Sequence, residues 1–137
     1  LFRSAEMSIE DILKNDLKNN YPEGYTTLDQ YANGLAKAIK NGMKIIRSGD
    51  ALLIYKDIAK GVAEAHVING GVSIIKGINY LFKALMQLRE NGYKEAQTTY
   101  DKREFAKLLS MLPVFQVTTE KIDEGDGRTY LTTVRLA

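Results

Sequence analysis

The sequence predicts an α/β (α+β) fold in a single domain, with a mixed sheet and the element order β-α-α-β-β-β-α-β-α-β-β. Three observations support this prediction. The chain has 137 residues, enough for one hydrophobic core and too few for two. Apolar residues recur with helical spacing in some segments and alternate or run together in others. Turn-forming residues separate these segments, so we expect residues 1–137 to form one domain with helices packed on a sheet.

The N-terminal part is expected to contain a short strand, residues 1–5, and then two helices. Ser8, with an acidic residue three positions later, is typical of a helix start, because its hydroxyl can accept a hydrogen bond from a first-turn amide. A loop with proline and glycine ends this helix, and we interpret its tyrosines, Tyr21 and Tyr25, as packing aromatics. A second capping pattern at residues 27–30 begins the next helix.

Three strands are predicted after the helix stop at Asn41-Gly42. Residues 43–46 and 51–55 read as a hairpin around a Ser-Gly-Asp turn. Residues 51–55 are almost continuously apolar, which favours a central strand that is covered on both faces. Residues 56–60 are interpreted as a connection, and residues 62–68 as the next strand.

The stretch from residue 62 to residue 92 organises the predicted fold. Its strand leads into a turn with two glycines and then into an amphipathic helix that ends at Asn91-Gly92. The first amides of a helix have no internal partner and lie at the positive end of its dipole, so this turn is a candidate anion site. One apolar stripe is expected to be buried along the helix: Ile74, Ile78, Leu81, Leu85 and Leu88.

The C-terminal part is expected to hold a strand, a helix and a hairpin. The strand covers residues 93–100, and Asp101 is the expected cap of a helix over residues 102–112, which Pro113 stops. The hairpin joins residues 115–122 to residues 128–136 through a turn at residues 124–127.

Composition argues against several kinds of site and partner. The chain has no cysteine and a single histidine, His66, so we expect neither a thiol nucleophile nor a metal centre. The net charge of +2 comes from lysines scattered among acidic residues, which is typical of a solvated surface rather than a nucleic-acid interface. No apolar run approaches the roughly 18 residues that a membrane span needs. We therefore expect no metal, no membrane and no nucleic-acid partner.

Three local patterns, together with the element order, resemble one known family. Residues 2–5 followed by residues 10–12 are similar to the family's opening strand and first helix. Lys76-Gly77-Ile78 resembles the middle of its phosphate-binding loop, Arg/Gln-x-x-Gly-x-Gly/Ala. Residues 106–109, which run to Val114-Phe115, resemble its late helix and the Gly-Phe that follows. The family is GNAT, the superfamily of acyl-CoA-dependent N-acetyltransferases, and the resemblance in element order covers nearly the whole chain.

The resemblance implies acetyl-CoA as the cofactor, with its phosphates at the turn after the strand at residues 62–68. It also implies a slot between that strand and the one that contains Glu95, which would take the pantetheine arm. The residues expected to bind the cofactor are Val67, Ile68, Asn69, Gly70, Gly71, Lys76, Gly77, Ile78 and Asn79.

Three residues are candidates for proton transfer. An amine must be neutral before it attacks a thioester, and alkyl ammonium groups lose a proton near pH ~10, so a general base helps. Glu64 and His66 lie two apart on a strand and share a face; the resemblance favours Glu64 as the base, with His66 second. Tyr100 is a candidate acid for the departing thiolate. The alternatives are structural: Glu64 pairs with a lysine or arginine, His66 lies in a half-buried face, and Tyr100 is a packing aromatic.

The sequence departs from the family pattern at several positions. Ile74 takes the place of the basic or Gln residue, Ile75 that of the first glycine, and Asn79 that of the last glycine. A β-branched residue crowds the backbone where glycine would let a pyrophosphate approach. The family's late-helix tyrosine, a common general acid, falls at Ser110. Residues 105–137 also resemble an internal virion protein of short-tailed phages that has this fold and a similarly altered loop.

Two functions follow as hypotheses. The first is an N-acetyltransferase that moves an acyl group from acetyl-CoA to an amine of a small molecule or a protein. The second is a catalytically inactive GNAT-fold protein with a structural or interaction role, such as a phage virion component that contacts other virion proteins. The expected location is the cytoplasm, or the virion if the protein is phage-encoded.

Overall fold

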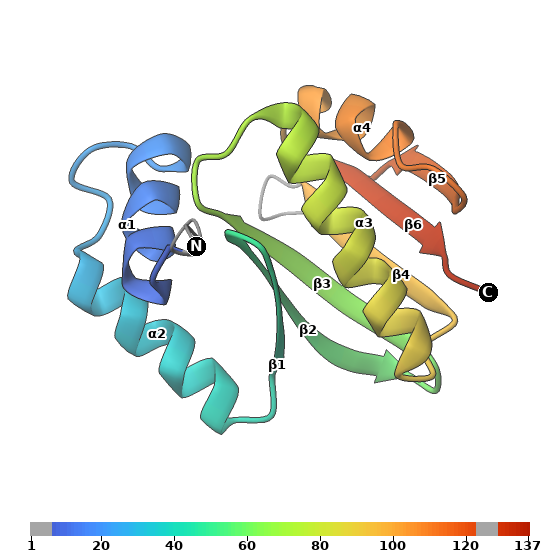
Figure 1. Ribbon diagram of the computed structural model, residues 1–137, viewed down its shortest axis with the longest axis horizontal. Helices are drawn as coiled ribbons and strands as arrows, with labels where there is room; N and C mark the ends of the chain where they lie inside the picture. Colours follow the sequence, from blue (N-terminus) through green and yellow to red (C-terminus); the bar gives the residue numbers. More distant parts are fainter. Residues whose placement is uncertain (1–6, 123–128) are drawn as a thin grey trace, which may run out of the picture.

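The computed structural model describes residues 7–122 and 129–137, and in these ranges four helices and six strands form a mixed α+β fold (Figure 1). The helices are α1 (Ile9–Asn20), α2 (Leu28–Lys40), α3 (Ile74–Glu90) and α4 (Arg103–Ser110). The strands are β1 (Lys44–Ser48), β2 (Ala51–Ala59), β3 (Val62–Asn69), β4 (Glu95–Tyr100), β5 (Gln116–Lys121) and β6 (Tyr130–Arg135). The predicted fold class is confirmed. The first predicted strand and the whole of the last predicted turn, residues 124–127, fall outside the described residues.

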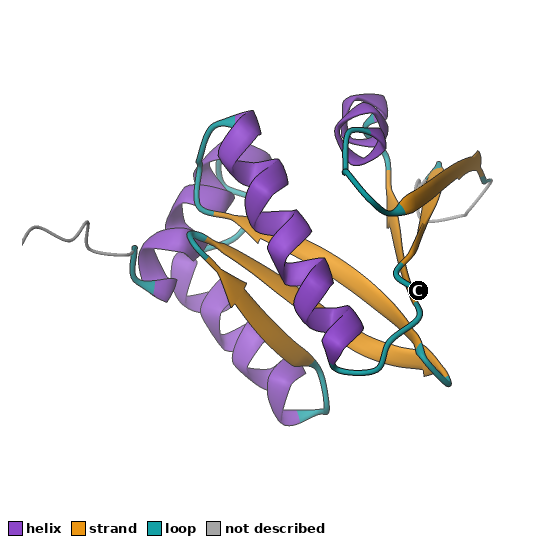
Figure 2. Cartoon of the chain, turned by 45° about the vertical axis from the view of Figure 1, so that its right-hand side comes forward, coloured by secondary structure: helices purple, strands orange, loops and turns teal. Residues whose placement is uncertain are grey.

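One sheet runs through the molecule in the order β1-β2-β3-β4-β6-β5. The strand pairs are antiparallel except β3 and β4, which are parallel. Helices α3 and α4 cover one face, and α1 and α2 cover the other face over β2 and β3 (Figures 1 and 2). None of the helices in the described ranges is long and apolar enough to cross a bilayer.

Two hydrophobic cores lie on opposite faces of β2. Leu53 and Tyr55 belong to the larger core beneath α3 and α4, whereas Leu52 and Ile54 belong to a smaller core with α1 and α2. Successive side chains of a strand point to opposite faces, so one apolar strand serves both cores. The prediction that residues 51–55 are covered on both faces is confirmed, since all five residues are buried.

Most of the predicted helix ends are confirmed. Ser8 accepts a hydrogen bond from the Asp11 amide at 3.1 Å, and Thr27 and Gln30 form the reciprocal capping box. After α3, Gly92 adopts the left-handed backbone conformation with φ 97°. The predicted start of α4 is wrong by one residue, because Lys102 occupies the cap position and makes no capping hydrogen bond, and the helix ends at Ser110 rather than at residue 112.

The first hairpin differs from its predicted bounds. Strand β2 continues through Ala59, so most of residues 56–60 are strand and not a connection. Backbone pairing accounts for this extension, because β2 goes on pairing with β3 as far as Ala59 and Val62, with an irregularity near Asp57. Strand β1 extends to Ser48, which pairs with Ala51 around a two-residue turn.

Candidate active site

The sheet opens between its two parallel strands. Pairing between β3 and β4 covers three residue pairs, beginning at Val62 with Glu95 and ending at Glu64 with Gln97. Beyond that point β3 runs on to Asn69 and β4 to Tyr100 without further pairing between them. The facing edges of both strands therefore present backbone N–H and C=O groups to the space between them. This is the splay that the family resemblance implies.

A cleft of about 1110 Å³ occupies the region where the strands part. One wall is the second half of β3 with the following turn, and another is the end of β4 with the start of α4. The third wall comes from α1, α2 and the loop between them. The cleft thus joins segments that are far apart in the sequence.

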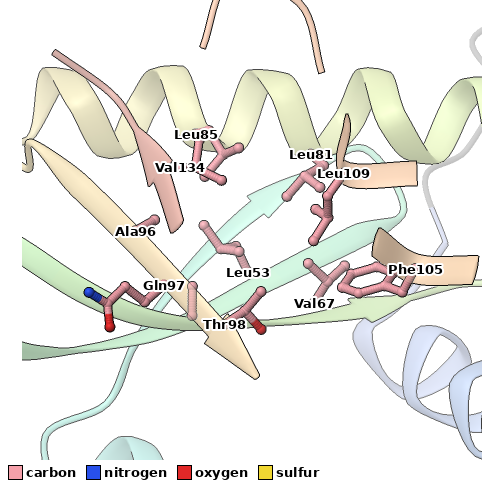
Figure 3. A pocket seen from close by; sticks show the side chains of 11 residues that line it. Leu53, Val67, Leu81, Leu85, Ala96, Gln97, Thr98, Phe105, Leu109 and Val134 are labelled. Atoms are coloured by element: carbon pink, nitrogen blue, oxygen red, sulfur yellow. The ribbon is translucent and has the colours of Figure 1, made fainter. Parts of the chain in front are cut away.

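A small apolar cavity adjoins this cleft beneath α3 and α4. It has a volume of about 30 Å³ and lies among Leu53, Leu81 and Leu109 (Figure 3). Val67 and Thr98 line both the cavity and the cleft, so the two spaces meet between the parted strands. The lining of the cavity is almost entirely hydrocarbon, which suits a short apolar group rather than a charged one.

Glu64 and His66 lie together on the face of β3 that points toward α1 and α2. Ile68, two residues further on, packs with Ile12 on this face, which fixes the orientation of the alternate side chains. His66 Nε2 is 3.4 Å from Glu64 Oε1, and each side chain is about one-third exposed. His66 lines the cleft and Glu64 does not. Within the described residues, the basic side chain next to the Glu64 carboxylate is His66, which is charged only when its ring is protonated, and not the lysine or arginine of the structural alternative.

Tyr100 reaches the same cleft from the other side of the sheet. Its ring packs edge-on against Phe105, with 5.0 Å between the ring centroids, next to the larger core. Its hydroxyl is 2.6 Å from Thr132 Oγ1, which is 2.8 Å from Thr119 Oγ1. Tyr100 is therefore both a packing aromatic and a cleft residue with a hydrogen-bonded hydroxyl. His66 on β3 and Tyr100 on β4 line one space because these two strands part beyond their last residue pair.

The residues predicted to bind a cofactor divide into two groups. Four of them line the cleft: Val67, Ile68, Asn69 and Gly71. The others do not line it: Gly70, Lys76, Gly77, Ile78 and Asn79. Gly70 is buried between hydrogen bonds, because its amide donates to the Asp50 carbonyl at 2.9 Å and its carbonyl accepts from Asn15 at 3.0 Å. Ile78 packs against the larger core, and Lys76 and Asn79 are exposed on α3.

The turn before α3 satisfies part of its own hydrogen-bonding capacity. Asn69 Oδ1 accepts hydrogen bonds from the Gly71 amide at 3.0 Å and the Val72 amide at 3.2 Å. Ser73 Oγ accepts from the Lys76 amide at 3.3 Å. Gly77 accommodates the Asn69 side chain, since a Cβ on Gly77 would lie 3.2 Å from Asn69 Nδ2. Side chains of the turn thus occupy three of the amides that would otherwise face an anion.

The first helical residues of α3 remain open. The amides of Ile74 and Ile75 precede the first helical hydrogen bond and have no intrahelical acceptor. Their side chains are 62% and 82% exposed. The prediction that Ile74 begins the buried stripe is therefore wrong, because the core contacts of α3 start one turn later, at Ile78.

Sequence reasoning overlooked a wall of tyrosines around a buried carboxylate. Tyr21 stacks on Tyr25 with centroids 5.2 Å apart and meets the edge of Tyr31 at 5.9 Å. Asp16 is 5% exposed and accepts hydrogen bonds from Tyr31 at 2.6 Å and Asn20 at 2.8 Å. Burial, followed by this hydrogen bond and the charge of Asp16, raises the pKa of Tyr31 far above its ordinary value. The signal for this wall in the sequence is three tyrosines close together around one helix–helix loop, two of which, Tyr21 and Tyr25, are interpreted from the sequence as packing aromatics.

Comparison with solved structures identifies the fold. An acetyltransferase of the GNAT family from Staphylococcus aureus Mu50 has a TM-score of 0.61 at 14% identity and covers 97% of this chain and 98% of its own. This chain has the GNAT fold. Aminoglycoside 6'-acetyltransferase type Ii matches with a TM-score of 0.66 at 13% identity, over 97% of this chain and 96% of that one. The sequence matches no protein-family model and no curated protein.

The neighbours include structures solved with acetyl-CoA. One of them is a GNAT superfamily phosphinothricin acetyltransferase from Sinorhizobium meliloti, with a TM-score of 0.57 at 10% identity, covering 95% of this chain and 84% of that one. Identities in this range show a shared fold, which is a general acyl-transfer fold in these neighbours.

Proposed function

We propose that this chain is an N-acyltransferase that takes an acyl group from acetyl-CoA and passes it to an amine. The observation that carries the proposal is the parting of β3 from β4 after Glu64 and Gln97, with a cleft in the opening. The GNAT-fold neighbour from Sinorhizobium meliloti that was solved with acetyl-CoA supports the choice of cofactor.

The residues at the cleft fit such a cofactor over most of its length. The facing edges of β3 and β4 beyond their last pair can exchange hydrogen bonds with the amides of a pantetheine arm. The free amides of Ile74 and Ile75 suit phosphate oxygens at the start of α3. Asn69 would have to release the amides of Gly71 and Val72 to complete that cradle.

Bound acetyl-CoA supplies a thioester carbonyl that an amine nitrogen can attack, so that a C–N bond forms as the C–S bond breaks. His66 lines the cleft, which favours it over Glu64 as the base that takes the amine proton, and it would do so at Nδ1 because Nε2 faces Glu64 Oε1. The Glu64 carboxylate, 3.4 Å away, would then stabilise the charged ring. The hydroxyl of Tyr100 would give a proton to the departing sulfur, with Thr132 holding its orientation at 2.6 Å.

A second candidate is a GNAT-fold protein without catalysis that acts by contact with other proteins, such as a virion component. Asn69 favours this candidate, because its carboxamide oxygen already accepts hydrogen bonds from two backbone amides of the turn before α3, where the phosphates are expected. Ser110, at the position where the family resemblance expects a tyrosine, also favours it.

Calorimetric titration with acetyl-CoA separates the two candidates. We expect heat of binding in the parent protein, and also in His66→Gln with similar affinity. We expect the rate of acetyl transfer to n-butylamine to fall by a factor of about 10² to 10⁴ in His66→Gln, because this is the range that a general base contributes. Glu90→Gln, at the exposed C-terminal end of α3, is the matched control and should behave as the parent does. Absence of heat at millimolar acetyl-CoA would overturn the enzyme proposal and leave the second candidate.

A further inference from the structure

We propose that the tyrosine–aspartate wall of the cleft, formed by Asp16, Tyr21, Tyr25 and Tyr31, binds an alkylammonium group. The preferred ligand is an aliphatic diamine, with one ammonium anchored at this wall and the second amine directed to His66. The assignment of the diamine as acceptor rests on the proposed acyl transfer, whereas the binding of an ammonium to the wall does not.

The buried negative charge of Asp16 favours a cationic ligand. The side chain is only 5% exposed, and its two oxygens accept hydrogen bonds from two neutral donors, Asn20 and Tyr31. No ion pair that the structure describes in residues 7–122 and 129–137 includes Asp16. Buried carboxylates are normally paired with a positive group, because desolvation of an isolated charge is costly. Asp16 borders the cleft, so a ligand can supply the missing charge.

The tyrosine rings provide the rest of a cation site. Tyr25 is 65% exposed and Tyr21 is 39% exposed, although the two rings stack on each other. An exposed stacked pair gains little from the core, but the faces of aromatic rings attract cations. Tyr31 meets Tyr21 edge-on and also holds Asp16, so rings and carboxylate form one continuous surface.

The neighbouring part of the cleft suits the methylene chain of such a ligand. Leu35, Ala38 and Met43 line the cleft on the same side as the tyrosines. Asp101 and Lys102 are the other charged residues that line it, and they lie at the end of β4 and the start of α4. The charged side chain on the tyrosine side of the cleft is therefore that of Asp16, and its negative charge disfavours an anionic ligand there.

A diamine fits better than a monoamine for an electrostatic reason. A carboxylate with aromatic faces stabilises the protonated form of whichever amine it binds, and that form cannot attack a thioester. The group at the wall is therefore an anchor and not the nucleophile. The reacting amine has to lie elsewhere in the same cleft, where His66 can take its proton.

The first arm of the test measures binding without acetyl-CoA. The tyrosine ring signals of the full chain are followed by NMR as n-butylammonium is added, with n-butanol as the uncharged control of similar shape. We expect saturable shifts with n-butylammonium and none with n-butanol. Tyr25→Leu should weaken binding about fivefold, while Tyr25→Phe keeps the aromatic face and should bind like the parent. Tyr25 is exposed, so neither change endangers folding.

Asp16→Asn keeps the shape of the side chain, removes its charge, and should weaken n-butylammonium binding about tenfold or more. Equal shifts with n-butanol, or unchanged affinity in Tyr25→Leu, would overturn the proposal.

The second arm measures acetyl transfer to 1,4-diaminobutane and to n-butylamine. We expect a lower KM for the diamine, and a rise in that KM of about fivefold in Tyr25→Leu with little change in kcat. If acetyl transfer proceeds and the two KM values are equal, the diamine assignment fails and the acyltransferase proposal stands. If acetyl-CoA does not bind, the acyltransferase proposal fails and the first arm alone decides the ammonium site.

Discussion

At the scale of single residues, Asn69 has the largest consequence for cofactor binding. It lies at the end of β3, and its carboxamide oxygen holds the amides of Gly71 and Val72. The same amides would be the natural partners of a phosphate at the start of α3. The side chain therefore competes with any anion that approaches this corner.

Two substitutions of Asn69, to alanine and to aspartate, should change the affinity for acetyl-CoA in opposite directions. Asn69→Ala removes the competing oxygen, and we expect binding to tighten about tenfold, since hydrogen bonds to charged groups contribute roughly 1.5–3 kcal/mol. Asn69→Asp keeps an acceptor at the same place and adds a negative charge, so binding should weaken. Calorimetry on the folded variants measures both affinities. Two variants that bind as the parent does would show that the phosphates do not use this turn.

At the scale of elements, α4 begins without the stabilising contacts of the other helices. Lys102 has the extended backbone of a cap residue, with φ −91° and ψ 119°, but its side chain makes no capping hydrogen bond. A lysine also places a positive charge at the positive end of the helix dipole. The wall of the cleft that α4 contributes is therefore held by packing of residues such as Phe105 and Leu109 rather than by its helix start.

A better cap should stabilise this element. Lys102→Ser supplies a hydroxyl acceptor and removes the unfavourable charge, and we expect the free energy of unfolding to rise by about 1 kcal/mol. Lys107→Ser, in the last turn of the same helix, is the matched control and should lower stability slightly, because it removes a favourable charge. Urea unfolding measures both. Equal changes in the free energy of unfolding of the two variants would show that capping at residue 102 does not stabilise the protein.

At the scale of the whole molecule, β2 connects the two hydrophobic cores. Leu52 packs in the core beneath α1 and α2, and its neighbour Leu53 packs in the core beneath α3 and α4. The cores share one strand, so they are expected to be lost together. That residues 1–137 form a single domain stays a prediction, and this shared strand provides a way to test it.

Leu52→Ala and Leu53→Ala should each lower the free energy of unfolding by about 2–5 kcal/mol, because each leaves a cavity in a buried core. The leucines are 0% and 3% exposed. Far-UV and tyrosine near-UV circular dichroism should report one coincident transition in both variants. Ile58→Ala is the control, since this residue of β2 is 46% exposed and should cost less than about 0.5 kcal/mol. Separate transitions for the two signals would contradict a single cooperative domain.

Local sequence patterns predicted the elements well and the site only in part. Ser8, the capping box at Thr27 and the stop at Gly92 depend on neighbours a few residues away, so the sequence contained their evidence. The shared face of Glu64 and His66 also followed from strand alternation. The contact between Asp16 and Tyr31 depends on how two helices pack, and the orientation of the Asn69 side chain depends on Gly77 in the next element. Such contacts are set by tertiary structure and left no local signal.

The three pairs that join β3 to β4 are the only rungs between the two halves of the described sheet. The sheet therefore has a seam through its middle, with a full ladder on either side. A ligand bound in the opening would form hydrogen bonds with both unpaired strand edges and so connect the two halves of the sheet. Ligand and scaffold would then strengthen one another, and an empty protein would be the looser of the two forms.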